Sequence, residues 1–256
     1  MKEQTNGVKK SALAKLKGFL SRLFYPDNIK CIFCGDDVPD YEAKPICNRC
    51  EKNVRYNSGN RCLICAEPIE NEAMVCDECQ LHKRSFKRAF CPFVYDGNVR
   101  KAILAYKDSN RRYLAKPFAK QIVKELKESG ISFDYVTFVP LTEKKKKKRG
   151  FDQAELLATY VAEGLNVPVF NVFEKIKDGK AQKKLGYNQR FENTQDMYRL
   201  LPHRFKRKDN VLIVDDVITT GATTGACAKL IEKKVANVYA AAIARNVLDK
   251  NKKRGK

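Results

Sequence analysis

The sequence contains no run of about 18 apolar residues, the length that a membrane-spanning helix needs, so we expect no membrane span. Histidine is also scarce. His82 and His203 are the only two, neither has an obvious partner, and we expect both on the surface. The basic, amphipathic segment from Val8 to Phe24 carries Lys and Arg where a signal peptide would be apolar, which disfavours secretion. We therefore expect a soluble, cytoplasmic protein whose residues 1–28 form a docking segment, with membrane-surface binding as the alternative.

Acidic residues are few relative to basic ones. The chain has 30 Asp and Glu against 51 Lys and Arg, a formal net charge of +21. Because unpaired charges are seldom buried, this surplus must face water or an anionic partner. The charge does not separate nucleic acid from phosphorylated metabolites or acidic lipid, and a lysine-rich surface without a specific partner is the plain alternative. With 256 residues, the chain is long enough for one sizeable core and a small appended module.

Eight of the ten cysteines form four CxxC pairs, separated by 12, 11 and 10 residues. Two thiolates three positions apart on a tight turn can face one ion, and four supply the tetrahedral sulfur set that Zn²⁺ accepts. We therefore expect two structural zinc ions, with disulfides as the disfavoured alternative. The spacing does not decide whether neighbouring pairs or interleaved pairs share an ion. The expected ligands are Cys31, Cys34, Cys47, Cys50, Cys62, Cys65, Cys76 and Cys79, while Cys91 and Cys227 are expected as small core residues.

From about Phe90 onward, apolar runs of strand length alternate with amphipathic runs of helix length, which indicates a parallel α/β sheet. Strands are expected at 90–95, 134–141, 167–173, 210–217 and 238–244, and helices at 113–127, 152–165 and 223–234. Ligands of such sheets bind at the carboxyl ends of the strands.

The segment from Val211 to Thr224 passes from an apolar strand through two acids and a short loop into a helix. Backbone N–H groups of such a loop and of the first helical turn converge on one point, where the helix dipole favours an anion. The expected phosphate-binding residues are Thr219, Thr220, Gly221, Ala222 and Thr223. Asp215 and Asp216 suit sugar hydroxyls or Mg²⁺ instead, because carboxylates accept hydrogen bonds. The alternative is an acid pair that only caps the helix.

The run VLIVDDVITTGAT resembles the signature with which type I phosphoribosyltransferases bind 5-phosphoribosyl-1-pyrophosphate (PRPP). Three further blocks match the ComF (ComFC) branch, namely Ile103–Lys107, Val139–Ala154 with RGFDQA, and Gln182–Asn193 with QKKLGYNQRFEN. The resemblance implies a phosphoribosyltransferase-like parallel sheet flanked by helices, after a small cysteine-rich zinc ribbon module. It divides the chain into a double zinc ribbon at 29–85, a phosphoribosyltransferase domain at 86–247 and a basic tail at 248–256.

The resemblance also implies roles at the site. Asp215 and Asp216 would hold the ribose with Mg²⁺, and the loop 140–150 would bind pyrophosphate, with Arg149 and Gly150 as its committed contacts. Arg190 and Asn193 would form a hood over the acceptor pocket. The catalytic candidates are Asp215, Asp216 and Arg149. The family pattern RGFNQ has Asp152 in place of Asn here, which puts that position in doubt as an anion contact. The basic run Lys144–Arg149 is also typical of a solvated, mobile loop.

Two functions are expected from this pattern. The first is a PRPP-binding protein in DNA uptake for natural transformation, which holds single-stranded DNA and docks on a helicase. The alternative is a Mg²⁺-dependent phosphoribosyltransferase of nucleotide metabolism with an unidentified acceptor. A repressor is disfavoured, since no helix-turn-helix pattern is evident. Basic residues and nearby aromatics could contact nucleic acid, with a structural staple and core packing as the alternatives. They are Lys83, Arg84, Lys87, Arg88, Phe86, Phe90 and Tyr113.

Overall fold

The computed structural model describes residues 30–38, 45–69, 73–108, 111–177, 194 and 196–247. The chain divides into two compact units, Met1–Lys52 and Asn53–Lys256. The predictions for 1–28, for the basic tail and for the hood residues Arg190 and Asn193 lie outside the described residues. Within the described ranges, no helix combines the length and apolar character that a membrane crossing requires.

The two tetracysteine modules share one local plan. In each, an antiparallel bridge closes a turn that carries the first CxxC pair, and a short helix carries the second pair. The bridges are Lys30–Asp37 and Arg61–Pro68, and the helices are α2 (Asn48–Glu51) and α3 (Asp77–Leu81). The residue after each first pair has positive φ, 80° at Gly35 and 59° at Ala66. The second module belongs to the larger unit, together with the sheet.

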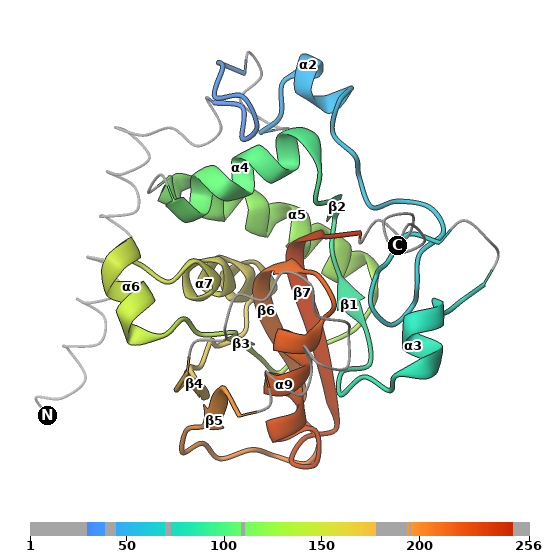
Figure 1. The fold of residues 1–256 in the computed structure, drawn as a ribbon, viewed down its shortest axis with the longest axis vertical. Helices are drawn as coiled ribbons and strands as arrows, with labels where there is room; N and C mark the ends of the chain where they lie inside the picture. The colour runs from blue at the N-terminus through green and yellow to red at the C-terminus, as the bar shows by residue number, and fades with distance from the viewer. Residues whose placement is uncertain are drawn as a thin grey trace, which may run out of the picture. The chain divides into compact units, whose positions relative to one another are not determined.

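A parallel sheet forms the centre of the larger unit (Figure 1). Its strand order is β1-β7-β6-β3, and β2 also pairs with β7. The strands are β1 (Ala89–Phe90), β2 (Phe93–Val94), β3 (Tyr135–Phe138), β6 (Asn210–Ile218) and β7 (Asn237–Arg245). Nearly every residue of β7 is buried, as expected for a strand covered on both faces.

Helices flank this sheet, and α5, α7 and α9 contact its strands. The helices of this part of the chain are α4 (Gly97–Asp108), η1 (Arg112–Leu114), α5 (Ala115–Glu128), α6 (Glu143–Arg149), α7 (Gln153–Leu165) and α9 (Ala222–Ile231). In β6, Val211 and Ile213 share a core with Ala226 and Cys227 of α9. Alternate residues of a strand point to opposite faces, so Leu212 and Val214 face away from α9. Cys227 and Cys91 are both fully buried, which confirms them as core residues.

The structure differs from the predicted elements in several places. The strand expected at 90–95 is split into β1 and β2. The strand expected at 167–173 reduces to one parallel bridge from Val169 to Val136. It is followed by β4 (Phe173–Lys175), which pairs antiparallel with β5 (Tyr198–Leu200) outside the main sheet. Helix α4 was not expected, although its buried residues recur at helical spacing. The basic run 144–149 is helical, within α6, and ends where Gly150 adopts a left-handed φ of 80°.

The structure also shows the burial of several residues for which the sequence suggested a surface position or a contact with nucleic acid. His203 is half-buried, and its ring packs 4.8 Å from Phe205 and 5.0 Å from Phe170, which is 41% exposed, so it lies in a partly exposed aromatic cluster. The aromatic neighbours supply the apolar contact that the sequence did not reveal. Phe86 and Phe90 are buried core residues, which excludes base stacking by either, whereas Tyr113 is 57% exposed.

Candidate functional site

The loop after β6 turns the chain from strand to helix within three residues. The strand ends at Ile218 and α9 begins at Ala222. Gly221, the N-cap residue, has a φ of 74°, a conformation that costs residues with a Cβ about 1–2 kcal/mol. The hydroxyl oxygen of Thr220 accepts a hydrogen bond from the N–H of Ala222 at 3.3 Å. The predicted residues Thr219–Thr223 therefore lie together at the N-terminus of a ten-residue helix, where backbone N–H groups and the helix dipole favour an anion.

The two acids of β6 point to opposite faces of the sheet. Asp215 continues the face of Val211 and Ile213, and its carboxylate accepts a hydrogen bond from the N–H of Asp216 at 2.7 Å. Asp216 is buried, and its two oxygens have separate partners. Lys107 Nζ lies 2.7 Å from Oδ1, and Gln153 Nε2 donates to Oδ2 at 2.8 Å. The adjacent acids thus have different surroundings.

These surroundings change the protonation of the site. Burial, together with the nearby charge of Asp216, raises the pKa of Asp215 to about 7. Burial lowers the pKa of Lys107, but the carboxylate of Asp216 outweighs it, so the pKa lies above its ordinary value. Lys107 is therefore a cation at neutral pH, whereas Asp215 changes charge close to it.

Three of the quoted sequence blocks meet at Asp216. Lys107 ends the Ile103–Lys107 block, and Arg149 and Gln153 belong to the RGFDQA block. Arg149 donates to the side-chain oxygen of Gln153 at 2.5 Å and lies 3.3 Å from a carboxylate oxygen of Asp108. Arg149 thus reaches the acid pair through Gln153. Lys107 and Gln153 were not expected at the site, although both lie in matching blocks.

Gly150 and Asp152 shape the turn between α6 and α7. The carbonyl of Gly150 accepts a hydrogen bond from Arg112 at 2.8 Å. Asp152 is the N-cap of α7, and it accepts from the N–H groups of Ala154 at 2.9 Å and Leu141 at 2.7 Å. Its carboxylate is thus occupied by backbone donors and is buried. This explains the acid at the position where the family has an amide: either side chain can cap the helix that carries Gln153.

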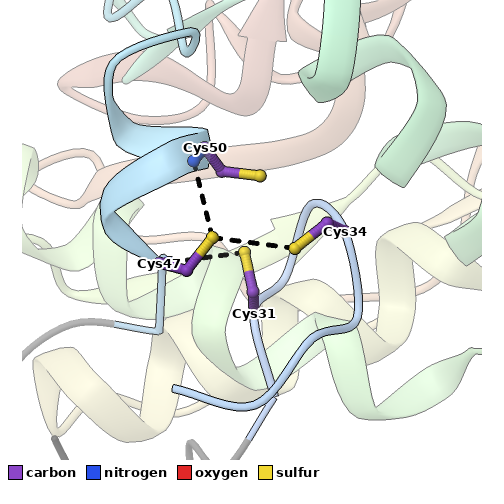
Figure 2. Close-up of side chains that lie close together, drawn as sticks. All are labelled: Cys31, Cys34, Cys47 and Cys50. Atoms are coloured by element: carbon purple, nitrogen blue, oxygen red, sulfur yellow. Dashed lines mark hydrogen bonds between the residues drawn. The ribbon is translucent and has the colours of Figure 1, made fainter. Parts of the chain in front are cut away.

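The first tetracysteine site is drawn in Figure 2, in which four sulfur-bearing side chains converge from a turn and from α2. The sulfur atoms of Cys34 and Cys47 lie 3.7 Å apart. The N–H groups of Cys47 and Cys50 donate to the sulfurs of Cys31 and Cys47, each at 3.4 Å. Such donors stabilise thiolates over thiols.

The second site has the same geometry. Its four cysteines are all buried, and the sulfurs of Cys65 and Cys76 lie 3.6 Å apart. A tetrahedral ion with Zn–S bonds of about 2.3 Å separates its ligands by about 3.8 Å, so both sets fit zinc. In each set the two pairs are consecutive in sequence, a choice that the spacing left open. Zinc bound here would be structural, because four cysteines leave no open coordination position.

Comparisons with known proteins agree with this architecture. Residues 20–80 match the family model of the double zinc ribbon domain. Competence protein F of Haemophilus influenzae is 24% identical over 218 residues, which cover 80% of this chain and 92% of that protein. The DNA utilization protein YhgH of Salmonella typhimurium is 25% identical over 193 residues, which cover 73% of this chain and 83% of that protein.

Among solved structures, an adenine phosphoribosyltransferase is similar at 21% identity and a TM-score of 0.35, over 60% of this chain and 79% of that one. The two zinc ribbon sites, the parallel sheet with its strand-loop-helix passage, and relatives matched along most of their length support the resemblance to ComF proteins. The chain is thus similar to competence protein F and YhgH, with a zinc ribbon module ahead of a phosphoribosyltransferase-like α/β domain.

Proposed function

We propose that this protein binds PRPP with Mg²⁺ and handles single-stranded DNA in the cytoplasm during DNA uptake. The observation that carries the proposal is the anion-directed loop Thr219–Thr223, which follows Asp215 and Asp216 on the same strand. The names of the relatives, competence protein F and DNA utilization protein, support the link to DNA.

Different residues would bind different parts of PRPP. The N–H groups of Thr219–Thr223 bind the 5′-phosphate, and the carboxylates of Asp215 and Asp216 accept hydrogen bonds from ribose hydroxyls. Two carboxylates near a strand end also offer the oxygen ligands that Mg²⁺ prefers, and the ion would neutralise part of the pyrophosphate charge. Arg149, held 2.5 Å from Gln153, supplies a further positive charge on the side of Asp216. PRPP would compete with Lys107 for Asp216.

Gly221→Ala tests the PRPP site. Alanine at a φ of 74° forces the loop to shift, so we expect affinity for PRPP in Mg²⁺ to fall about ten-fold in isothermal titration calorimetry. Gly130→Ala is the matched control, because Gly130 has a φ of 69° and open space around its Cβ position. Both variants carry similar backbone strain, but only Gly221→Ala changes the loop. Equal affinity in the two variants would argue against this binding site.

The basic surface of α6 is the proposed part of the DNA-binding surface. Lys144, Lys147 and Lys148 are exposed on this seven-residue helix, which directly precedes the RGFDQA block. Long cationic side chains held on one short helix can track a phosphate backbone, and affinity that depends on them falls as salt releases counterions.

Replacing Lys144, Lys147 and Lys148 by Ala should therefore weaken binding of a single-stranded oligonucleotide and flatten its salt dependence. Three lost phosphate contacts reduce the slope of log K against log salt by about 2. Fluorescence anisotropy over a salt series measures this slope. The control removes three exposed lysines of α5, Lys120, Lys124 and Lys127, so net charge changes equally. An identical change of slope in the control would contradict a role for α6.

The second candidate function is catalysis by the same site, which the cation Arg149 beside the Asp216 network favours. An acceptor would form a bond to C1 of the ribose as the bond from C1 to the pyrophosphate oxygen breaks, and pyrophosphate would leave with the electron pair. Orientation by the loop and charge stabilisation by Arg149 would suffice without a histidine base. Pyrophosphate release, screened over bases, amines and nucleic acids, measures this activity, and Asp216→Asn should abolish it. PRPP binding without release in the whole panel would contradict catalysis.

A further inference from the structure

Two buried arginines join the second zinc site to the loop at the end of β6. Arg84 donates through Nε to the sulfur of Cys79 at 3.3 Å and through Nη1 to the carbonyl of Thr220 at 2.8 Å. Arg245 donates to the carbonyl of Ile218 at 3.1 Å, and its other terminal nitrogen lies 3.9 Å from the sulfur of Cys65. Each guanidinium therefore contacts a zinc-ligand sulfur and a loop carbonyl.

The charge of the zinc site explains why these cations can be buried. Arg84 is 9% exposed and Arg245 is 3% exposed, and an unpaired charge at that depth would be costly. One Zn²⁺ with four thiolates carries a net charge of −2, which attracts both guanidinium groups. Arg245 also pairs with Glu67, so part of its charge is compensated there. Loss of zinc would free the cysteine side chain against which Arg84 is held.

The arginines also decide which way the loop peptides face. In a planar trans peptide, the carbonyl and the N–H of the next residue point in opposite directions. Because the carbonyls of Ile218 and Thr220 point at the arginines, the N–H groups of Thr219 and Gly221 point away from them. The carbonyls have their partners, so these N–H groups are on the opposite side of the loop from the arginines, where they can bind an anion.

Phe86 packs against the same loop. A Cβ at Gly221 would lie 3.4 Å from its ring and 3.9 Å from Nη1 of Arg84. Phe86 and Arg84 both lie within seven residues after Cys79, so both side chains that contact the loop belong to the segment that follows the zinc ribbon. The ribbon is thus continuous with the packing under the loop.

We infer that Arg84 is a positioning residue that makes the anion affinity of the loop depend on zinc at Cys62, Cys65, Cys76 and Cys79. This inference rests on the proposed PRPP site. Because coupling between two sites is reciprocal, PRPP bound at the loop also raises the affinity of this cluster for zinc. The first cluster belongs to the other compact unit, so its cysteines serve as the internal control for this coupling.

Arg84→Met tests the inference, with Lys83→Met as the control that removes the neighbouring exposed charge. In the ligand-free protein with two zinc ions bound, amide hydrogen exchange at 218–224 should be faster in Arg84→Met than in the control. Calorimetry should give an affinity for PRPP about ten-fold weaker, since a lost hydrogen bond from a charged donor has an effect of this order. Unchanged exchange at 218–224 would overturn the inference whether or not PRPP binds.

A second measurement uses the wild-type chain and so survives a variant that fails to fold. Thiol alkylation in the presence of a chelator, read by mass spectrometry, reports which cysteines have lost zinc. PRPP with Mg²⁺ should slow alkylation of Cys62–Cys79 several-fold and leave Cys31–Cys50 unchanged. If calorimetry detects PRPP binding, then equal slowing of alkylation in both clusters, or slowing in neither, contradicts the coupling and leaves the proposed PRPP site standing. No PRPP binding by the wild type contradicts the proposed function as well.

Discussion

Cys76→Ser is expected to reduce the bound zinc from two ions per chain to one and to unfold the second ribbon. The free energy of zinc binding to such sites is about 10–16 kcal/mol and is coupled to folding, because a short cysteine-rich segment has little other core. Among the described residues, the partly buried hydrophobic side chains packed against the four cysteines are Ile64, Ile69 and Val75. The change also removes the zinc–thiolate charge beside Arg84 and Arg245, so we expect it to destabilise the sheet domain as well as the ribbon.

Zinc stoichiometry by mass spectrometry and thermal unfolding of the whole chain measure this effect. Cys91→Ser is the matched control, because Cys91 is equally buried but lies outside both zinc sites. The control should retain two zinc ions and show only the cost of a buried hydroxyl, about 1–3 kcal/mol. Retention of two zinc ions by Cys76→Ser, or a melting temperature equal to that of Cys91→Ser, would refute the assignment.

Asp216→Ala should destabilise the protein by about 3–5 kcal/mol, which is the usual cost of removing one partner of a buried ion pair. The alanine leaves Lys107 without its carboxylate at 2.7 Å and Gln153 without its acceptor at 2.8 Å. The side chain of Lys107 is 21% exposed, so water can partly solvate it and the lower end of this range is expected. Denaturant unfolding gives the free energy of unfolding directly.

Glu155→Ala is the control for Asp216→Ala, because Glu155 and Lys146 pair at the same 2.7 Å but are 42% and 41% exposed. An exposed pair contributes at most about 1 kcal/mol, since both charges remain solvated when it is broken. The double change Asp216→Asn with Lys107→Met should recover most of the loss, because no unpaired charge remains. Equal destabilisation by Asp216→Ala and Glu155→Ala would show that burial does not strengthen the Lys107 pair.

The parts of the site that are contiguous in the chain could be predicted from the sequence. The cysteine pairs and the run from Val211 to Thr224 could be interpreted directly, because a turn places residues three positions apart on one ion and a strand-loop-helix passage places N–H groups at a helix start. The buried strands β6 and β7 were equally visible as apolar runs. The zinc sites and the loop after β6 depend on the geometry of short contiguous segments, so they could be predicted without knowledge of tertiary contacts.

The contacts between residues that are distant in the chain could not be predicted, because they depend on the packing of whole elements. Gln153 and Asp216 are 63 positions apart and Arg84 and Thr220 are 136 apart, and neither contact leaves a periodic signal in the sequence. From the sequence, Asp216 was expected to bind ribose hydroxyls or Mg²⁺. In the structure, its carboxylate is already paired with Lys107 of α4 and Gln153 of α7. The order in which the cysteine pairs combine was likewise set by the fold of each ribbon. Such contacts depend on how whole elements pack, because a buried charge takes as partner whichever opposite charge or donor the packing brings within reach.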